Sequence, residues 1–181
     1  MVLMSNVSCL MSYISCLSKI NRKANSLQPP NPGPRGQLHG PALSVKSALR
    51  IACSRQNLQQ VRDFVRGHLT GHGFAEVAVN QVVLAVDEVV ANFIIHANGE
   101  DAAQHLDLTL LLQNKALEVE ITDQGDTIFL PAPAPAPDLR EYIRQSRKGG
   151  MGMVLVNRLM DRVEFFTRGN HTVCHLSKTL G

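Results

Sequence analysis

The chain has 181 residues, a formal net charge of +3 and 44% hydrophobic residues, which suits one domain with its own core. Aromatic residues make up 4% and no block of lysine and arginine stands out, so the composition argues against a nucleic-acid-binding surface. No stretch approaches the roughly 20 continuous apolar residues of a membrane span. The four cysteines lack metal-binding spacing, and we expect reduced thiols in a cytoplasmic protein, with Cys53 and Cys174 as small strand residues.

The first part of the chain differs in composition from the rest. Residues 1–27 alternate apolar residues with serine, and their positive charges follow the apolar part, whereas a secretory signal carries them before it. A weak amphipathic helix and a start codon assigned too early are the two interpretations. Residues 28–41 hold five prolines and three glycines, which is the composition of a linker. We therefore expect a disordered extension and linker over residues 1–43 and a folded domain over residues 44–181.

Hydrophobic periodicity predicts an ordered series of strands and helices in the folded domain. After the first strand, an apolar stripe at helical spacing ends at Gly71 and Gly73, and Ser54 or Asn57 can cap the start of this helix. The predicted strands are residues 47–53, 105–113, 116–122, 162–167 and 171–179, and the predicted helices are residues 58–69, 79–96, 138–145 and 151–160.

The connections and the order of the elements indicate the fold class. Asn114-Lys115 joins two strands as a tight hairpin, and residues 131–137, PAPAPAP, read as a stiff exposed loop. A mixed, mostly antiparallel sheet covered on one face by helices is an α+β two-layer sandwich.

The predicted helix over residues 79–96 carries polar residues on an otherwise apolar surface. Glu88, Asn92 and His96 follow one another at four-residue intervals, which places them along one side of the helix. Such groups are costly among apolar neighbours unless something satisfies them. A carboxylate, an amide oxygen and water suit Mg²⁺, which usually arrives with nucleotide phosphates. A stripe that is merely solvated or capped by neighbours is the alternative.

Three further features lie in the second half of the chain. Asp123-Gln-Gly125 ends a predicted strand, where the aspartate can accept a hydrogen bond from an amino group and the glycine leaves room for a flat ligand; both are also ordinary turn residues. Residues 148–153, KGGMGM, precede an apolar helix, so their backbone amides either hold an anion or form a flexible joint. Thr172 opens the last strand and either reaches a ligand held by Asp123 or is a simple strand former.

Taken in order, these features resemble a known pattern. Glu88-Val-Val-Ala-Asn92-Phe-Ile-Ile-His96 resembles the N box of the GHKL ATPase superfamily, Asp123-Gln-Gly125 its G1 box, and Gly150-Met-Gly152-Met153 its G2 box. The short length and the wording DEVVANFIIHA are most similar to the anti-sigma-factor serine/threonine kinases, as is the ending GGMGMVLVNRLMDRVEFFTRGNHTVCHLSK. The resemblance covers residues 44 to 180, and the ordered combination is far more specific than any one box.

The resemblance implies the Bergerat ATP-binding fold, with ATP and Mg²⁺ as ligands. It assigns Asn92 to Mg²⁺ and, through the ion, to the phosphates, and it assigns Glu88 to orienting or deprotonating the acceptor hydroxyl. Asp123 is assigned to the adenine amino group, with Thr172 supporting that contact. Residues 126–149 are expected to be the ATP lid. The residues expected to bind nucleotide are Asn92, Asp123, Gly125, Gly150, Met151, Gly152 and Thr172.

Two features leave room for variation within this pattern. His96 either touches phosphate or packs at the helix end, and we favour packing. The segment after Gly125, DTIFLPAPAPAP, lacks the GxGF-like form common after this box in the family. This departure bears on the efficiency of ATP turnover more than on ATP binding.

The resemblance also implies a function. The leading hypothesis is a kinase that phosphorylates a serine or threonine of a STAS-type anti-anti-sigma factor and that sequesters a sigma factor. Family members often form homodimers, and no contact with nucleic acid or membrane is expected. A non-catalytic ATP-binding regulator is the first alternative. A detached histidine-kinase catalytic domain is the second, and it would need a phosphoacceptor helix pair that residues 1–43 cannot supply.

Overall fold

The computed structural model describes residues 44–125, 128–130 and 151–180. The expectations for residues 1–43, for the proline-rich loop and for a short helix over residues 138–145 lie outside these described residues.

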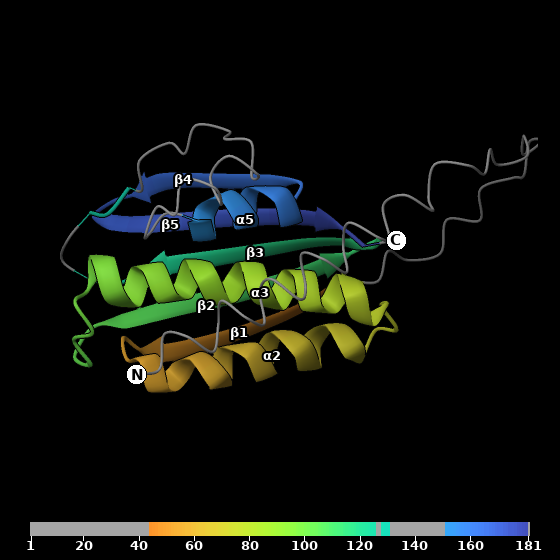
Figure 1. Cartoon of the computed structure of the whole chain (residues 1–181), viewed down its shortest axis with the longest axis horizontal. Coiled ribbons are helices and arrows are strands. Elements are labelled where there is room, and N and C mark those ends of the chain that lie inside the picture. Colours follow the sequence, from red (N-terminus) through yellow and green to blue (C-terminus); the bar gives the residue numbers. More distant parts are fainter. Residues whose placement is uncertain (1–43, 126–127, 131–150, 181) are drawn as a thin grey trace, which may run out of the picture. The chain divides into compact units, whose positions relative to one another are not determined.

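Five strands form one sheet in the order β1-β2-β3-β5-β4 (Figure 1). Every neighbouring pair of described strands is antiparallel, so the sheet is more regular than the mixed one expected. The α+β class is confirmed, and the hairpin strands and the last strand lie within one residue of the predicted bounds. The strands are β1 (Ser44–Ala52), β2 (His105–Gln113), β3 (Ala116–Asp123), β4 (Arg162–Arg168) and β5 (His171–Thr179).

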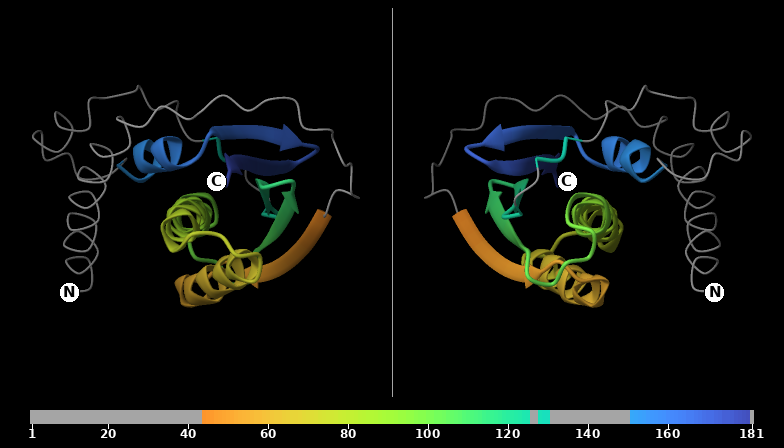
Figure 2. Two further views of the ribbon diagram at one scale, coloured as in Figure 1. Left: turned by 90° about the vertical axis from the view of Figure 1, so that its right-hand side faces the viewer. Right: turned by 90° about the vertical axis from the view of Figure 1, so that its left-hand side faces the viewer.

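The three α-helices of the described residues lie on one face of this sheet (Figure 2). The central helix packs between the other two, and its buried side chains are almost all valine. Valine has a modest helix propensity, so burial against the sheet and the neighbouring helices stabilises this helix more than intrinsic preference does. The helices are α2 (Leu58–Thr70), α3 (Glu76–Asn92) and α5 (Met151–Leu159), with a 3-10 turn η2 (Arg55–Asn57) before α2 and a π-helical turn η3 (Phe93–Ala97) after α3.

Strict alternation explains how the strands face the helices. The residues of β2 at even positions, from Leu106 to Leu112, are buried, as are Leu117, Val119 and Ile121 of β3. Successive strand residues point to opposite faces, so these side chains form one apolar layer under the helices. At the hairpin, Asn114 and Lys115 both have positive φ (49° and 66°), the backbone of a two-residue primed turn.

The central helix differs from the prediction at both ends. It begins at Glu76, three residues before the expected start, and the helical hydrogen bonding changes to the π pattern from Phe93 to Ala97. The backbone N–H of Asn98 donates to the carbonyl of Phe93 over 3.0 Å, a bond that spans five residues and inserts one extra residue into the last turn. Together α3 and η3 match a membrane span in length and apolar composition, but their apolar face fills the core.

The first strand also differs slightly from the prediction. It starts at Ser44 because β2 offers nine residues for pairing, from Ser44 opposite Gln113 to Ala52 opposite His105. Cys53 is fully buried but lies one residue beyond the strand, so the expectation that it is a strand residue is wrong. Cys174 is buried within β5, as expected, and both thiols are free.

A buried histidine links α2 to β1. His68 is 8% exposed, and its Nδ1 lies 2.9 Å from Ser47 Oγ. Its Nε2 is buried and has no hydrogen-bond partner among the described residues. The His72 ring is 5.5 Å away. Burial, with a smaller contribution from His72, lowers the pKa of His68 below that of an ordinary histidine.

This lowered pKa predicts a pH dependence of stability. The unfolded chain binds a proton at position 68 near pH 6.5, whereas the folded chain resists it, so the free energy of unfolding should fall as the pH drops below about 6.5. His68→Gln should flatten this dependence in urea unfolding measured between pH 7.5 and pH 5. His96→Gln, which changes an exposed histidine without an ion-pair partner among the described residues, serves as the control and should keep the wild-type slope. Identical slopes in all three proteins would refute the prediction.

Candidate functional site

An aspartate at the end of β3 is the most deeply buried acid among the described residues. Asp123 is 1% exposed, and its Oδ1 accepts hydrogen bonds from the Gly125 N–H (2.9 Å) and from Asn98 Nδ2 (3.0 Å). Its Oδ2 is buried without a partner among the described residues. A buried carboxylate oxygen without a donor is costly. The arrangement therefore suits a ligand that presents an N–H group.

The next strand places a hydroxyl beside this carboxylate. Thr172 of β5 is the register partner of Asp123 and is also 1% exposed. The two strands are neighbours, as the prediction for Thr172 required. Thr172 Oγ1 accepts the N–H of Phe129 over 3.0 Å. This bond ties the described part of the predicted lid, residues 128–130, to the end of the sheet that carries Asp123.

The residue between Asp123 and Gly125 is held from the opposite face of the sheet. The Gln124 side chain donates to Asp107 Oδ2 over 2.9 Å, and its backbone N–H donates to the carbonyl of His105 over 3.0 Å. Asp107 in turn forms a two-bond ion pair with Arg50, at 2.6 Å for each bond. These contacts fix the turn whose other side presents the Asp123 carboxylate.

A second acid meets the start of α5. An ideal Cβ added to Gly152 would lie 2.6 to 2.7 Å from the carboxyl atoms of Glu88. The absence of a side chain at 152 thus lets α5 approach Glu88, and the structure joins one residue of the predicted N box to one of the predicted G2 box. Burial, and then the nearby charge of Asp87, raise the pKa of Glu88 above that of an ordinary glutamate.

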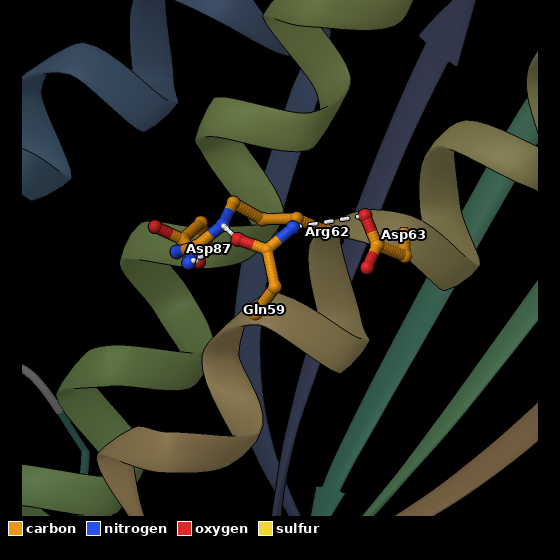
Figure 3. Close-up of polar contacts among 4 residues, drawn as sticks. All are labelled: Gln59, Arg62, Asp63 and Asp87. Carbon is orange, nitrogen blue, oxygen red and sulfur yellow. Dashed lines mark hydrogen bonds and ion pairs between the residues drawn. The ribbon is translucent and has the colours of Figure 1, made fainter.

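The neighbour of Glu88 forms an ion pair between two helices (Figure 3). Arg62 Nη1 of α2 lies 2.9 Å from Asp87 Oδ1 of α3. Gln59 Oε1 accepts from the same guanidinium, and Gln59 Nε2 donates to Asp63. Burial raises the pKa of Asp87 and Arg62 opposes that rise. This pair holds a negative charge next to Glu88, and the sequence analysis did not single it out.

The other two residues of the N box lie toward the end of the central helix. Asn92 is half-buried and is the last residue of α3, immediately before the π-helical turn. His96 is exposed, and its ring stacks on Phe129 with 6.5 Å between centroids. Phe129 also meets Phe93 edge to face at 6.4 Å. His96 thus packs near the helix end, next to the described lid residues.

Gly125 faces an unexpected neighbour. A Cβ at this position would lie 2.2 Å from Asn98 Oδ1 and 3.1 Å from Asp123 Oδ1. The Asn98 side chain thus lies beside Gly125. The prediction that this glycine makes room for a ligand stays a prediction. In the sequence, Asn98-Gly99 indicates only the end of the central helix. An asparagine before a glycine is a common helix stop, so nothing in the pattern marked it as a partner of Asp123.

Part of the predicted site lies outside the described residues. Gly150 is not described, and neither are residues 126–127 and 131–149 of the predicted lid. Met151 begins α5, and only its backbone is described. Their predicted roles stay predictions.

Comparison with known proteins places the chain in a family. The family model described as the histidine kinase-like ATPase domain matches residues 51–178. Serine-protein kinase RsbW of Halalkalibacterium halodurans is 31% identical over 107 residues, which are 58% of this chain and 65% of that protein. RsbW of Listeria monocytogenes is 26% identical over 124 residues, which are 67% of this chain and 79% of that protein. The chain thus spans just under two thirds of the length of the first relative.

A solved structure shares the fold. The RsbU and RsbW domains of a Mycobacterium tuberculosis protein match with a TM-score of 0.55 and 14% identity, over 75% of this chain and 32% of that chain. The fold and the family match together define a domain of the ATPase class. The chain belongs to the histidine kinase-like ATPase domain family. Its similarity to RsbW serine-protein kinases confirms the predicted resemblance to the anti-sigma-factor kinases.

The pair formed by Asp87 and Arg62 predicts the titration of Glu88. Removing the negative charge in Asp87→Asn should lower the pKa of Glu88, because that charge opposes ionisation. Carboxyl ¹³C NMR across pH 3 to 8 measures this pKa directly, without reference to any activity. The matched control is Asp63→Asn, which removes a charge from the same side-chain cluster at a residue that does not contribute to the Glu88 pKa. Equal changes in both variants would contradict the assignment.

Proposed function

We propose that the chain is an ATP-binding serine/threonine kinase and anti-sigma factor. It phosphorylates a STAS-type anti-anti-sigma factor and sequesters a sigma factor. The observation that carries ATP binding is the buried Asp123 Oδ2, which has no hydrogen-bond partner among the described residues and fits the amino group of adenine. Membership of the ATPase family and the names of the RsbW relatives support the class of reaction.

In this proposal, residues at the end of the sheet recognise the base. Asp123 accepts from the adenine amino group through Oδ2, while its other oxygen stays bonded to the protein. Thr172 supports this contact, because its hydroxyl accepts from Phe129 and keeps its own proton for a neighbour. The backbone at Gly125 lies alongside the base.

In this proposal, the helical layer binds the phosphates. Asn92 would hold Mg²⁺, which neutralises phosphate charge when it is bound. No group of three or more histidine, cysteine, aspartate or glutamate side chains could hold a metal within the described ranges. The Asn92 amide and the phosphates would hold the ion together. The backbone N–H groups at the start of α5, where Met151 and Gly152 lie, would face the phosphates.

Glu88 is the candidate base for the acceptor hydroxyl. A general base works best when its pKa approaches the operating pH, and burial moves the pKa of Glu88 in that direction. In the proposed transfer, the serine or threonine oxygen attacks the γ-phosphorus, its proton passes to Glu88, and ADP leaves. Positioning supplies most of the rate in such reactions, so few catalytic side chains suffice.

The proposed setting is a cytoplasmic partner switch. The nucleotide in the site, ATP or ADP, selects the partner, because the conformation that each nucleotide favours has a different affinity for each partner protein. We further propose that the protein forms a homodimer and makes no direct contact with nucleic acid or membrane. A non-catalytic ATP-binding regulator is the second candidate, favoured by the departure of residues 126–137 from the family pattern.

Asn92→Ala tests the phosphate end of the site. The variant should lose Mg²⁺-dependent ATP binding, with affinity falling roughly 100-fold, because an amide bound to a charged group is removed. Titration with a fluorescent ATP analogue, with and without Mg²⁺, measures this loss. Asn80→Ala, on the same helix, should bind like the wild type. An unchanged affinity in Asn92→Ala would refute the role.

Glu88→Ala separates the kinase from the binder. Loss of a general base should slow transfer by about 10² to 10⁴, while ATP binding stays close to that of the wild type. Incubation with labelled ATP and a STAS-domain protein measures transfer, and Glu88→Gln repeats the test without a change of shape. A wild-type protein that binds ATP and transfers no phosphate would favour the second candidate.

A further inference from the structure

Asn98 links the central helix to the buried acid of the base site. It follows the π-helical turn, and its Nδ2 lies 3.1 Å from the carbonyl oxygen of Phe93 and 3.0 Å from Asp123 Oδ1. Its backbone N–H donates to the same carbonyl over 3.0 Å. The π-helical turn thus carries the side chain to the end of β3, 25 residues further along the chain.

The orientation of this amide follows from its surroundings. A carbonyl and a carboxylate oxygen only accept hydrogen bonds, so the nitrogen of the amide must face both. The Asn98 Oδ1 then points to Gly125, where an added Cβ would lie 2.2 Å away. A side chain at position 125 would displace the amide, so Gly125 and Asn98 fit only as a pair.

The two carboxylate oxygens of Asp123 differ in their hydrogen-bond partners. Oδ1 takes both protein donors, from Asn98 and from Gly125. Oδ2 is left as a buried acceptor without a protein partner among the described residues.

We propose that Asn98 is a positioning residue that fixes the Asp123 carboxylate for a purine with an amino group at position 6. This proposal rests on the proposed function and adds base selectivity to it. Adenine presents a donor to Oδ2, whereas guanine presents a carbonyl oxygen, which the carboxylate repels. Without the Asn98 hydrogen bond, the Asp123 carboxylate can rotate toward other donors. The affinities for purines with and without the amino group then differ less.

The test compares three triphosphates that differ at position 6 of the purine. ATP carries the amino group, purine riboside triphosphate carries hydrogen, and GTP carries a carbonyl. Dissociation constants come from calorimetry with Mg²⁺ present. The wild type should prefer ATP over purine riboside triphosphate by roughly tenfold, the value of one hydrogen bond to a charged group. It should reject GTP more strongly.

Asn98→Ala should reduce this preference rather than weaken all binding. The affinity for ATP should fall by roughly tenfold, while the affinity for purine riboside triphosphate changes little. This difference would show that residue 98 and the amino group of the base contribute to binding together. The matched control is Asn57→Ala: the Asn57 amide also donates to a carbonyl five residues earlier, over 2.9 Å, outside the site. This control should keep the wild-type preference.

Two further measurements keep the test decisive if Asn98→Ala is poorly folded. Asn98→Asp keeps the size of the side chain but removes the donor and sets two carboxylates side by side, so it should lose the ATP preference. In the wild type, the ¹⁵N resonance of the Asn98 side-chain amide should shift with ATP and shift less with purine riboside triphosphate.

The outcomes separate this proposal from the proposed function. If the wild type binds ATP and the Asn98 variants weaken all three nucleotides by one factor, Asn98 is only structural and the positioning role is overturned. The same holds if the wild-type amide resonance responds equally to ATP and purine riboside triphosphate. If the folded wild type binds no ATP at millimolar concentration, both proposals fail.

Discussion

The buried carboxylate of Asp123 is the constraint on which the site depends. A charged group that is 1% exposed is tolerated only when hydrogen bonds compensate for the water it has lost. The protein supplies donors to one oxygen and none from the described residues to the other. The end of β3, the π-helical turn and the contacts of Gln124 all serve to hold this acid in one place.

The two layers divide the proposed functions between them. In the proposal, the end of the sheet at Asp123 and Thr172 would recognise the base. The helices α3 and α5 would present Asn92 and a glycine-bearing helix start to the phosphates, and Glu88 to the acceptor hydroxyl. The two parts meet at the end of the central helix, because Asn98 follows Asn92 by six residues and touches Asp123. Movement of this helix end would therefore be felt by both parts.

Much of the fold could be predicted from the sequence, because its signals are local. Alternation in β2 and β3, and glycines after α2, gave bounds close to those observed. The adjacency of β3 and β5 could not be predicted from local patterns, since strand order depends on pairing across 49 residues, as between Asp123 and Thr172. The π-helical turn could not be predicted, because FIIHA has the apolar pattern of an ordinary helix.

The site was predicted in part for the same reason. Motif residues such as Glu88 and Asp123 stand out by type and spacing, whereas Asn98 and Arg62 have ordinary local patterns and acquire their contacts only in three dimensions. The reason for Gly152 also emerged only from packing. It allows a carboxylate of another helix to approach, which no inspection of KGGMGM would reveal.

The fit between Gly125 and Asn98 constrains how this chain can vary. Alanine at 125 places a methyl group on the amide oxygen, so it requires a shorter residue at 98, and that residue would surrender its bond to Asp123. With asparagine at 98, glycine at 125 is therefore favoured by the side chain beside it and not by its own backbone angle.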